Sequence, residues 1–217
     1  MNKAITISGL LSYAWATYKS QAQSLSLFAL ALLVVEFGIQ SIFVIPLIGW
    51  VVGIALSSIV MMGVIVAILK VVDGGKVAIS DLYMHRTPFW WFLGASVLQS
   101  IFIGFGSMLF VIPGVIVLVL SVFVPYIVMD QHKGPLESFK ESYYLAKGVF
   151  WKILGLLILI LLMNAVGVAL FVVGLVVSLP VSAIALSKLY RELLSARVPM
   201  DIDTDIVETA TDLRIES

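Results

Sequence analysis

The chain of 217 residues contains no cysteine, and only 12% of its residues are charged. The absence of cysteine excludes disulfides and thiolate chemistry. A soluble domain carries about a quarter of its residues as Asp, Glu, Lys or Arg, so this chain has too few polar side chains to cover a soluble fold of its size. Its mean hydropathy of +1.13 and its 61% of hydrophobic residues indicate a protein whose surface is covered by lipid.

Motifs for catalysis and for metal binding are also missing. The sequence contains no G-x-S-x-G, Walker or H-E-x-x-H pattern. Two histidines, His85 and His132, lie in different connections. Asp201, Asp203 and Asp205 resemble the start of an EF-hand loop, but the glycine and the final glutamate of that loop are absent. The sequence therefore predicts a protein that is not an enzyme and that has no cofactor and no metal site.

The apolar residues are gathered in six runs whose lengths suit a bilayer. A hydrocarbon core of about 30 Å needs roughly 20 helical residues. The six runs lie near residues 24–45, 47–69, 89–112, 114–129, 149–171 and 173–190. They come in pairs joined by short uncharged turns, with tips at Pro46, Pro113, Gly114 and Gly174. The predicted fold is an all-α polytopic membrane helical bundle, with six transmembrane helices arranged as three hairpins.

The chain repeats one pattern three times. The stretches "SIFVIPLIG", "MLFVIPGV" and "ALFVVGLV" each stand at a predicted hairpin tip. A polar and aromatic segment precedes each hairpin, at residues 5–19, 77–91 and 134–148. The repeated unit is therefore predicted to be one interfacial helix followed by one hairpin.

The three polar segments are typical of amphipathic helices at a membrane surface. In the third segment, Leu136, Phe139 and Tyr143 share one helical face, with charged residues on the other. Aromatic rings and long lysine side chains favour the boundary between lipid and water. The residues that we assign to this boundary are Trp15, Lys19, Lys140 and Lys147. We expect the aromatic faces of these helices to point toward lipid on the cytoplasmic side.

All thirteen Lys and Arg residues lie on one side of the predicted bundle. They fall before the first run, between the hairpins and after the last run, whereas the three hairpin tips have none. Because short cytoplasmic loops carry an excess of Lys and Arg, both termini are predicted to be cytoplasmic. Residues 1–198 then form the membrane domain, and residues 199–217 form an acidic, flexible cytoplasmic tail.

One longer stretch resembles a known family. Residues 111–155, "VIPGVIVLVLSVFVPYIVMDQHKGPLESFKESYYLAKGVFWKILG", combine an apolar V-[IV]-P-G run, a Pro-Tyr pair, an acidic residue and an amphipathic segment. This pattern resembles the membrane domain of some bacterial glycerophosphoryl diester phosphodiesterases and of related six-span inner-membrane proteins. The resemblance implies a multi-pass protein of the bacterial inner membrane without an assigned activity. The sequence has no counterpart of the soluble phosphodiesterase domain, so no catalytic residue carries over.

Glu36 is the one ionisable side chain well inside a predicted span. A carboxyl group is costly in lipid, so it is a functional candidate by default. The residues that could converge with it in the bundle interior are Gln40, Gln99 and Asn164. Helix breaks are predicted at Pro125 and Pro180, and broken helices can line transport sites. Glu36 also suits a structural role as a hydrogen-bonding group between helices.

Three functions remain open on the sequence alone. The one we favour is a non-enzymatic membrane protein that organises lipids or a partner protein from the cytoplasmic face, because polar surface is predicted only there. The second is a small transporter or channel with an intramembrane site around Glu36. The third is a membrane-shaping hairpin protein, because all interfacial helices would lie in one leaflet. The predicted partners are membrane lipids and a cytoplasmic or membrane protein, with no nucleic acid.

Overall fold

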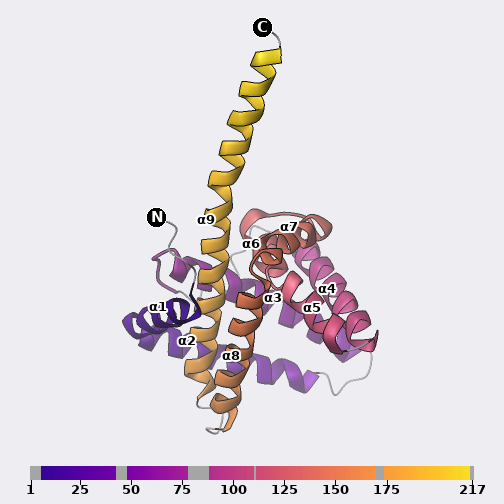
Figure 1. Ribbon diagram of the computed structural model, residues 1–217. Helices are drawn as coiled ribbons and strands as arrows, with labels where there is room; N and C mark the ends of the chain where they lie inside the picture. The colour runs from indigo at the N-terminus through magenta and orange to yellow at the C-terminus, as the bar shows by residue number, and fades with distance from the viewer. Residues whose placement is uncertain (1–5, 43–47, 78–87, 110, 170–173, 216–217) are drawn as a thin grey trace.

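The computed structural model describes residues 6–42, 48–77, 88–109, 111–169 and 174–215. Side chains in these ranges are described too, except at 42, 48, 50, 51, 109, 111 and 198–215. Every regular element in the described ranges is an α-helix, which confirms the predicted all-α class. Figure 1 shows the helices gathered in one bundle, from which the C-terminal helix extends.

The order of the helices follows the predicted repeat in two of its three copies. The helices are α1 (Ile7–Ser20), α2 (Ala22–Ile42), α3 (Ile48–Val72), α4 (Phe89–Leu109), α5 (Val111–Ser121), α6 (Val124–Gln131), α7 (Pro135–Lys147), α8 (Phe150–Ala169) and α9 (Leu175–Ile215). The short helix α1 precedes the pair α2 and α3, and the short helix α7 precedes the pair α8 and α9. The interfacial segment predicted at 77–91 lies mostly outside the described residues.

Five helical stretches in the described part of the chain are long and apolar enough to cross a membrane. They are Ala22–Ser41, Val52–Val72, Phe89–Met108, Ile112–Gln131 and Phe150–Ala169. The predicted sixth span, 173–190, corresponds to the first part of α9. There Lys188 and Arg191 follow the helix start at Leu175 too soon for an apolar stretch of full length. The structure is thus that of a helical membrane protein with five candidate spans rather than six.

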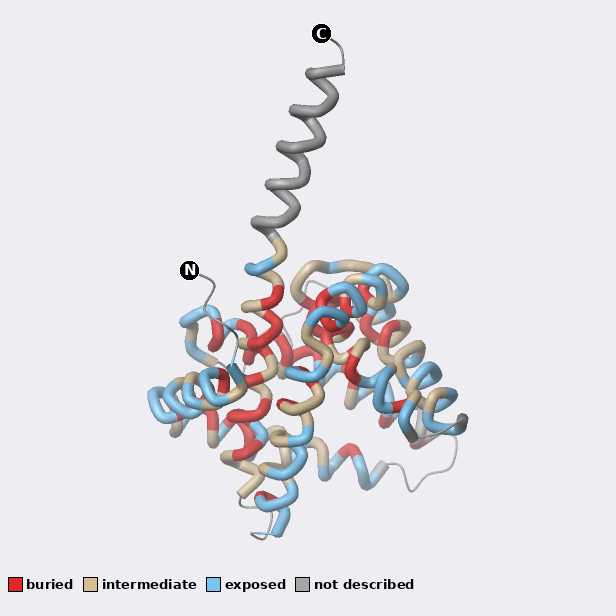
Figure 2. Tube along the Cα trace, viewed as in Figure 1, coloured by how far each residue is buried: buried red, intermediate tan, exposed pale blue. Residues whose placement is uncertain are grey.

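The candidate spans divide into outer and inner helices. In α2, α4 and α8, which begin the three hairpins, 22%, 11% and 17% of the residues in an 18-residue apolar stretch of each span are buried. In α3 and in the pair α5 and α6, which come second, the buried shares are 44% and 50%. The first part of α9 also contributes fully buried residues, among them Ile184 and Ala185. Each hairpin therefore places its first helix outside and its second in the core, and Figure 2 shows buried segments gathered around α6 and α9.

The helix after the second hairpin tip is interrupted between Ser121 and Val124, ahead of Pro125. Ser142 on α7 closes this interruption. Its hydroxyl donates to the carbonyl of Leu120 at 2.7 Å and accepts from the N–H of Phe123 at 3.2 Å. The break predicted at Pro125 is therefore present, with Pro125 in the first turn of α6, where its missing N–H leaves no helical bond unmade.

The helix α9 differs from the sequence prediction at two points. The break predicted at Pro180 is wrong, because α9 runs through this position without interruption. Pro180 is buried, and a packed membrane helix tolerates the loss of one backbone bond. The tail predicted to be flexible continues α9 as helix to Ile215 and extends beyond the bundle (Figure 1). Residues 199–215 contain no glycine that would end a helix.

The structure places three of the four predicted tips at the starts of helices. Pro113 and Gly114 lie in the first turn of α5, and Gly174 immediately precedes α9. Proline suits a first turn because that N–H has no helical partner. The fourth predicted tip, Pro46, lies outside the described residues.

Glycines close two hairpin tips by allowing the backbones to approach. A Cβ atom on Gly174 would lie 2.7 Å from the Cα of Gly167, and one on Gly114 would lie 2.9 Å from the backbone nitrogen of Ser107. Both distances are too short for a real Cβ contact. Neither Gly114 nor Gly174 has a positive φ, so they are needed for close packing and not for an unusual backbone conformation.

The two described interfacial segments form helices, but each also buries one face in the protein. On α7, Leu136 and Tyr143 are exposed as predicted, while the buried face carries Ser138 and Ser142. On α1, the prediction of an apolar face toward lipid is wrong in part. Leu10, Ala14 and Tyr18 are buried in the hydrophobic core, where α1 packs against α9. The apolar stripe of α1 finds protein partners because the third hairpin lies beside it.

Replacing Gly114 with Ala is expected to lower the free energy of unfolding by about 1–3 kcal/mol, because the added methyl group overlaps Ser107 across the hairpin tip. Gly104 on α4 is the matched control, since nothing lies within 4 Å of its Cβ position. The Gly104→Ala protein should be unchanged or more stable by up to about 1 kcal/mol. Reversible unfolding in detergent micelles measures both variants, and equal changes would contradict the close approach.

Candidate functional site

Charged residues that lie far apart in the sequence meet at one end of the bundle. Arg191 of α9 binds Asp73, which follows α3, through Nε to Oδ1 at 2.9 Å and Nη2 to Oδ2 at 2.6 Å. Its Nη1 also donates to Oδ2 of Asp130 in α6, at 2.7 Å. The second helix of each hairpin thus contributes one member of this ion cluster, which we define as Asp73, Asp130 and Arg191.

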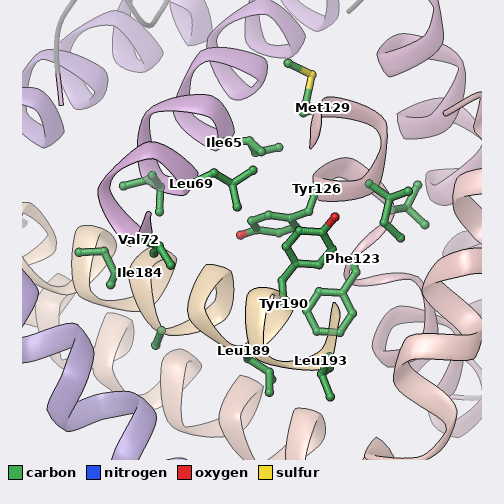
Figure 3. Close-up of a cluster of buried hydrophobic side chains, with 14 of the residues drawn as sticks. Ile65, Leu69, Val72, Phe123, Tyr126, Met129, Ile184, Leu189, Tyr190 and Leu193 are labelled. Atoms are coloured by element: carbon green, nitrogen blue, oxygen red, sulfur yellow. The ribbon is translucent and has the colours of Figure 1, made fainter. Parts of the chain in front are cut away.

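Tyr190 connects the ion cluster to the hydrophobic core. Its hydroxyl donates to Oδ2 of Asp130 at 2.9 Å and accepts from Nε2 of Gln131 at 3.1 Å. Its ring centroid lies 5.7 Å from that of Tyr126 and 5.9 Å from that of Phe123. Figure 3 shows these rings together between α6 and α9, among aliphatic side chains of α3. The ion cluster therefore contacts the aromatic side chains of the hydrophobic core through Tyr190.

Arg191 is a permanent charge in this cluster. Burial lowers the pKa of Arg191, but its hydrogen bonds to Asp73 and Asp130 outweigh burial and raise that pKa. The paired bonds to Asp73 fix the position of both side chains, as is usual when a guanidinium meets a carboxylate in this geometry. The arrangement is suited to holding three helices together.

A cavity of 410 Å³ lies beside the ion cluster. All three cluster residues line it, together with Lys70 and the apolar side chains of Leu69 and Met129. In the described ranges, no group of three or more His, Asp or Glu residues is placed to hold a metal ion. The cavity is polar where it meets the cluster and apolar where it meets the core.

A second set of ion pairs joins α7 to α9. Glu141 on α7 accepts from Nζ of Lys133 at 3.4 Å and also from Nη1 of Arg197. Arg197 lies about 9 Å beyond Arg191 along the helix axis, and its guanidinium lies 5.9 Å from the ring centroid of Tyr144. These contacts tie α7 to α9 at the same end of the bundle as the ion cluster.

The helices α1, α7 and α8 carry exposed aromatic rings beside lysines. The ammonium of Lys19 lies 5.2 Å from the ring centroid of Trp15, and that of Lys147 lies 5.6 Å from the ring centroid of Tyr143. Trp151 at the start of α8 is 79% exposed. We call the exposed residues of α7 and the start of α8 the aromatic and lysine surface: Lys140, Tyr143, Lys147, Trp151 and Lys152. The four residues predicted to be interfacial, Trp15, Lys19, Lys140 and Lys147, are all exposed.

Glu36 is hydrogen-bonded within its own hairpin. Its Oε1 accepts from Nε2 of Gln40 and from Oγ of Ser57, both at 3.3 Å. Ser57 lies on α3, so the carboxyl group links the two helices of the first hairpin. This contact agrees with a structural role between helices.

The other two residues of the predicted intramembrane site do not join Glu36. Gln99 on α4 donates instead to the carbonyl and the hydroxyl of Ser121, at 2.9 and 3.1 Å. Asn164 makes no hydrogen bond to Glu36 in the described structure, and its Oδ1 is buried without a partner. The predicted convergence is therefore wrong for these two residues. Gln99 lies on α4, which packs against α3, α5, α6 and α7, and Asn164 lies on α8, whereas α2 packs mainly against α3 and α9.

Comparison of the chain with models of protein families, with curated proteins and with solved structures gives no match. The resemblance drawn from residues 111–155 accordingly stays a prediction.

The sequence predicts that the charged residues lie on one side of the membrane, but it does not predict the ion cluster. One signal was present in the sequence, since each member follows an apolar run that forms the second helix of a hairpin. The sequence does not predict which of these residues form ion pairs, because Arg191 is 118 positions from Asp73 and 61 from Asp130. Only the packing of α3, α6 and α9 brings these side chains together.

Replacing Arg191 with Met should lower the free energy of unfolding by about 2 kcal/mol, because it leaves Asp130 partly buried without its counter-charge. The estimate is modest because Asp73 is half exposed and water can solvate it. The control is Lys152→Met, an exposed position at the start of α8, which should change stability by no more than about 0.5 kcal/mol. Thermal unfolding in detergent micelles compares them. Equal effects of the two variants would show that the ion cluster does not hold the bundle together.

Proposed function

We propose that this protein is a non-enzymatic, multi-pass protein of a bacterial inner membrane that organises anionic lipids around its charged end. The observation that carries the proposal is the aromatic and lysine surface on α7 and the start of α8. Exposed tryptophan and tyrosine rings favour the level of the lipid headgroups, and lysines near them attract anionic headgroups.

The helix α7 is suited to contact headgroups because its polar groups are sorted between two sides. Ser138 and Ser142 are buried, and Glu141 is paired within the protein. The outward side carries Lys140 and Lys147, and Lys152 follows on α8. Three exposed lysines against one exposed acid, Glu137, leave a charge of +2 on this surface. This positive surface complements an anionic bilayer leaflet.

We further propose that α9 supplies a sixth crossing, with both termini in the cytoplasm. From Leu175 to Ser187 the helix covers about 20 Å, and Lys188 can extend its side chain toward the interface. The ammonium of Lys188 lies 4.6 Å from the ring centroid of Tyr13, whose helix, α1, carries the exposed Trp15 and Lys19. The segregation of Lys and Arg supports the cytoplasmic side for this end.

If the proposal is correct, neutralising the lysines weakens the binding of anionic lipid and leaves the binding of zwitterionic lipid unchanged. The variant that combines Lys140→Gln, Lys147→Gln and Lys152→Gln should bind phosphatidylglycerol at least about tenfold more weakly, because each lysine near a charged bilayer contributes about 1 kcal/mol. Binding of phosphatidylcholine should not change. Native mass spectrometry of the purified protein with defined lipid mixtures measures both, and the preference should fall as salt is added.

The matched control is Glu137→Gln, which removes the exposed acid from the same helix and should leave phosphatidylglycerol binding equal or stronger. A wild-type protein that retains both lipids equally would contradict the proposal. Retention of a stoichiometric protein partner that the triple lysine variant loses, with lipid binding unchanged, would favour organisation of a protein instead.

The proposed topology predicts which positions meet water on each side. The natural sequence has no cysteine, so single cysteines can be labelled without background. Cysteines that replace Lys140 and Ser195, both exposed, should react with an impermeant maleimide only after the cells are permeabilised. A cysteine at Ser41, exposed near the end of α2, should react in intact cells. Labelling at Lys140 or Ser195 in intact cells would contradict cytoplasmic placement.

A further inference from the structure

A cavity of 580 Å³ lies between α2, α3, α8 and α9, away from the ion cluster. Its walls are aliphatic for most of their area and include Leu32, Val64, Ile68, Leu157 and Leu186. Met61 and Leu179 at its edge are 46% and 39% exposed. Because α2, α3 and α8 are candidate spans, this exposed edge faces lipid, and molecules dissolved in the bilayer can reach the cavity.

The cavity is elongated along the axes of α2 and α3. On α3 its lining runs from Ser57 to Ile68, which is about 16 Å along the helix axis. On α2 it runs from Phe28 to Glu36, or about 12 Å. The same slot is therefore bounded by more than two turns of α2 and of α3. This shape fits an extended alkyl chain.

Polar atoms mark one part of this slot. Glu36 and Ser57 both line it, and they are hydrogen-bonded to each other. None of the described lining residues is Lys, Arg or His, so the protein supplies no counter-charge to the carboxyl group there. A bound molecule with a hydrogen-bond donor would complement Glu36.

A second, independent observation comes from α9. Ser182 lines the same cavity, is 6% exposed, and its hydroxyl has no hydrogen-bond partner. A buried hydroxyl without a partner costs about 1–3 kcal/mol in proteins. A ligand with a polar group in this slot would satisfy it.

We infer that this cavity binds a single-chain amphiphile, whose alkyl chain fills the aliphatic slot and whose hydroxyl or ammonium head donates a hydrogen bond to Glu36. The head lies beside Ser57, and the chain extends along α3 toward Ile68. This site is separate from the aromatic and lysine surface, so it stands or falls independently of the proposed function.

The test uses the full chain in phosphatidylcholine nanodiscs and a diazirine-bearing analogue of dodecanol as the photoreactive probe. Labelling should be saturable and should map to peptides that line the cavity. Unlabelled dodecanol and dodecylammonium should compete at concentrations at least about tenfold lower than dodecane, which lacks the donor. Labelling that does not saturate, or equal competition by dodecane, would overturn the inference.

Substitutions test the aliphatic slot and its polar end separately. Ala183 lines the cavity, and Ala183→Phe should fill it and abolish saturable labelling, whereas Ala165→Phe on the exposed side of α8 should not. Glu36→Gln keeps an acceptor, so dodecanol should still compete while dodecylammonium competes about tenfold less well. If Ala183→Phe fails to fold, Glu36→Leu tests the head directly by removing the advantage of both competitors over dodecane. Unchanged competition in Glu36→Leu would overturn the assignment.

Discussion

Solvation by lipid is the constraint on which the rest of the structure depends. The outer helices expose large apolar side chains, with Phe37 on α2 at 79%, Phe105 on α4 at 67% and Leu161 on α8 at 68%. Soluble monomers rarely expose apolar surface of this extent to water, whereas hydrocarbon solvates such a surface. The same hydrocarbon offers no hydrogen bonds to the backbone, so polar groups freed in a membrane helix must find protein partners. The interruption between α5 and α6 meets this demand through the hydroxyl of Ser142.

Lipid on the outside also removes the hydrophobic effect as a force between helices, so close packing and polar contacts must hold the bundle. Glycines supply the close packing at two hairpin tips, and the ion cluster supplies polar contacts between α9 and the C-terminal ends of α3 and α6. Arg191 joins all three hairpins there, and Arg197 of α9 pairs with Glu141, so α7 and the lysines that it carries are held beside the ion cluster. A rigid charged end of this kind can present several lysines to the same leaflet, which is what organisation of anionic lipids requires.

Much of this could be predicted from the sequence, because lipid imposes simple rules on composition. The all-α class, the helices of the first and third repeat units and the break before Pro125 follow from run length, spacing and proline chemistry. The sixth span could not be settled in this way, since α9 reaches Lys188 before a full apolar length is complete. The buried face of α7 could not be predicted either, because Ser142 hydrogen-bonds to the helix break between α5 and α6. The partners of Gln99 and Arg191 depend on which helices pack together, and a repeat pattern does not specify that packing.

The central claim is that the first helix of each hairpin faces lipid while the second forms the core. Spin labels on cysteines that replace Phe105 and Leu161, compared with one that replaces the buried Ile65 of α3, test it directly in vesicles. The account predicts that the labels at Phe105 and Leu161 relax strongly with oxygen, which dissolves in lipid, and weakly with a water-soluble nickel chelate. The label at Ile65 should be shielded from both. Accessibility to the nickel chelate at Phe105 and Leu161 as high as at the exposed Lys140 would contradict the account.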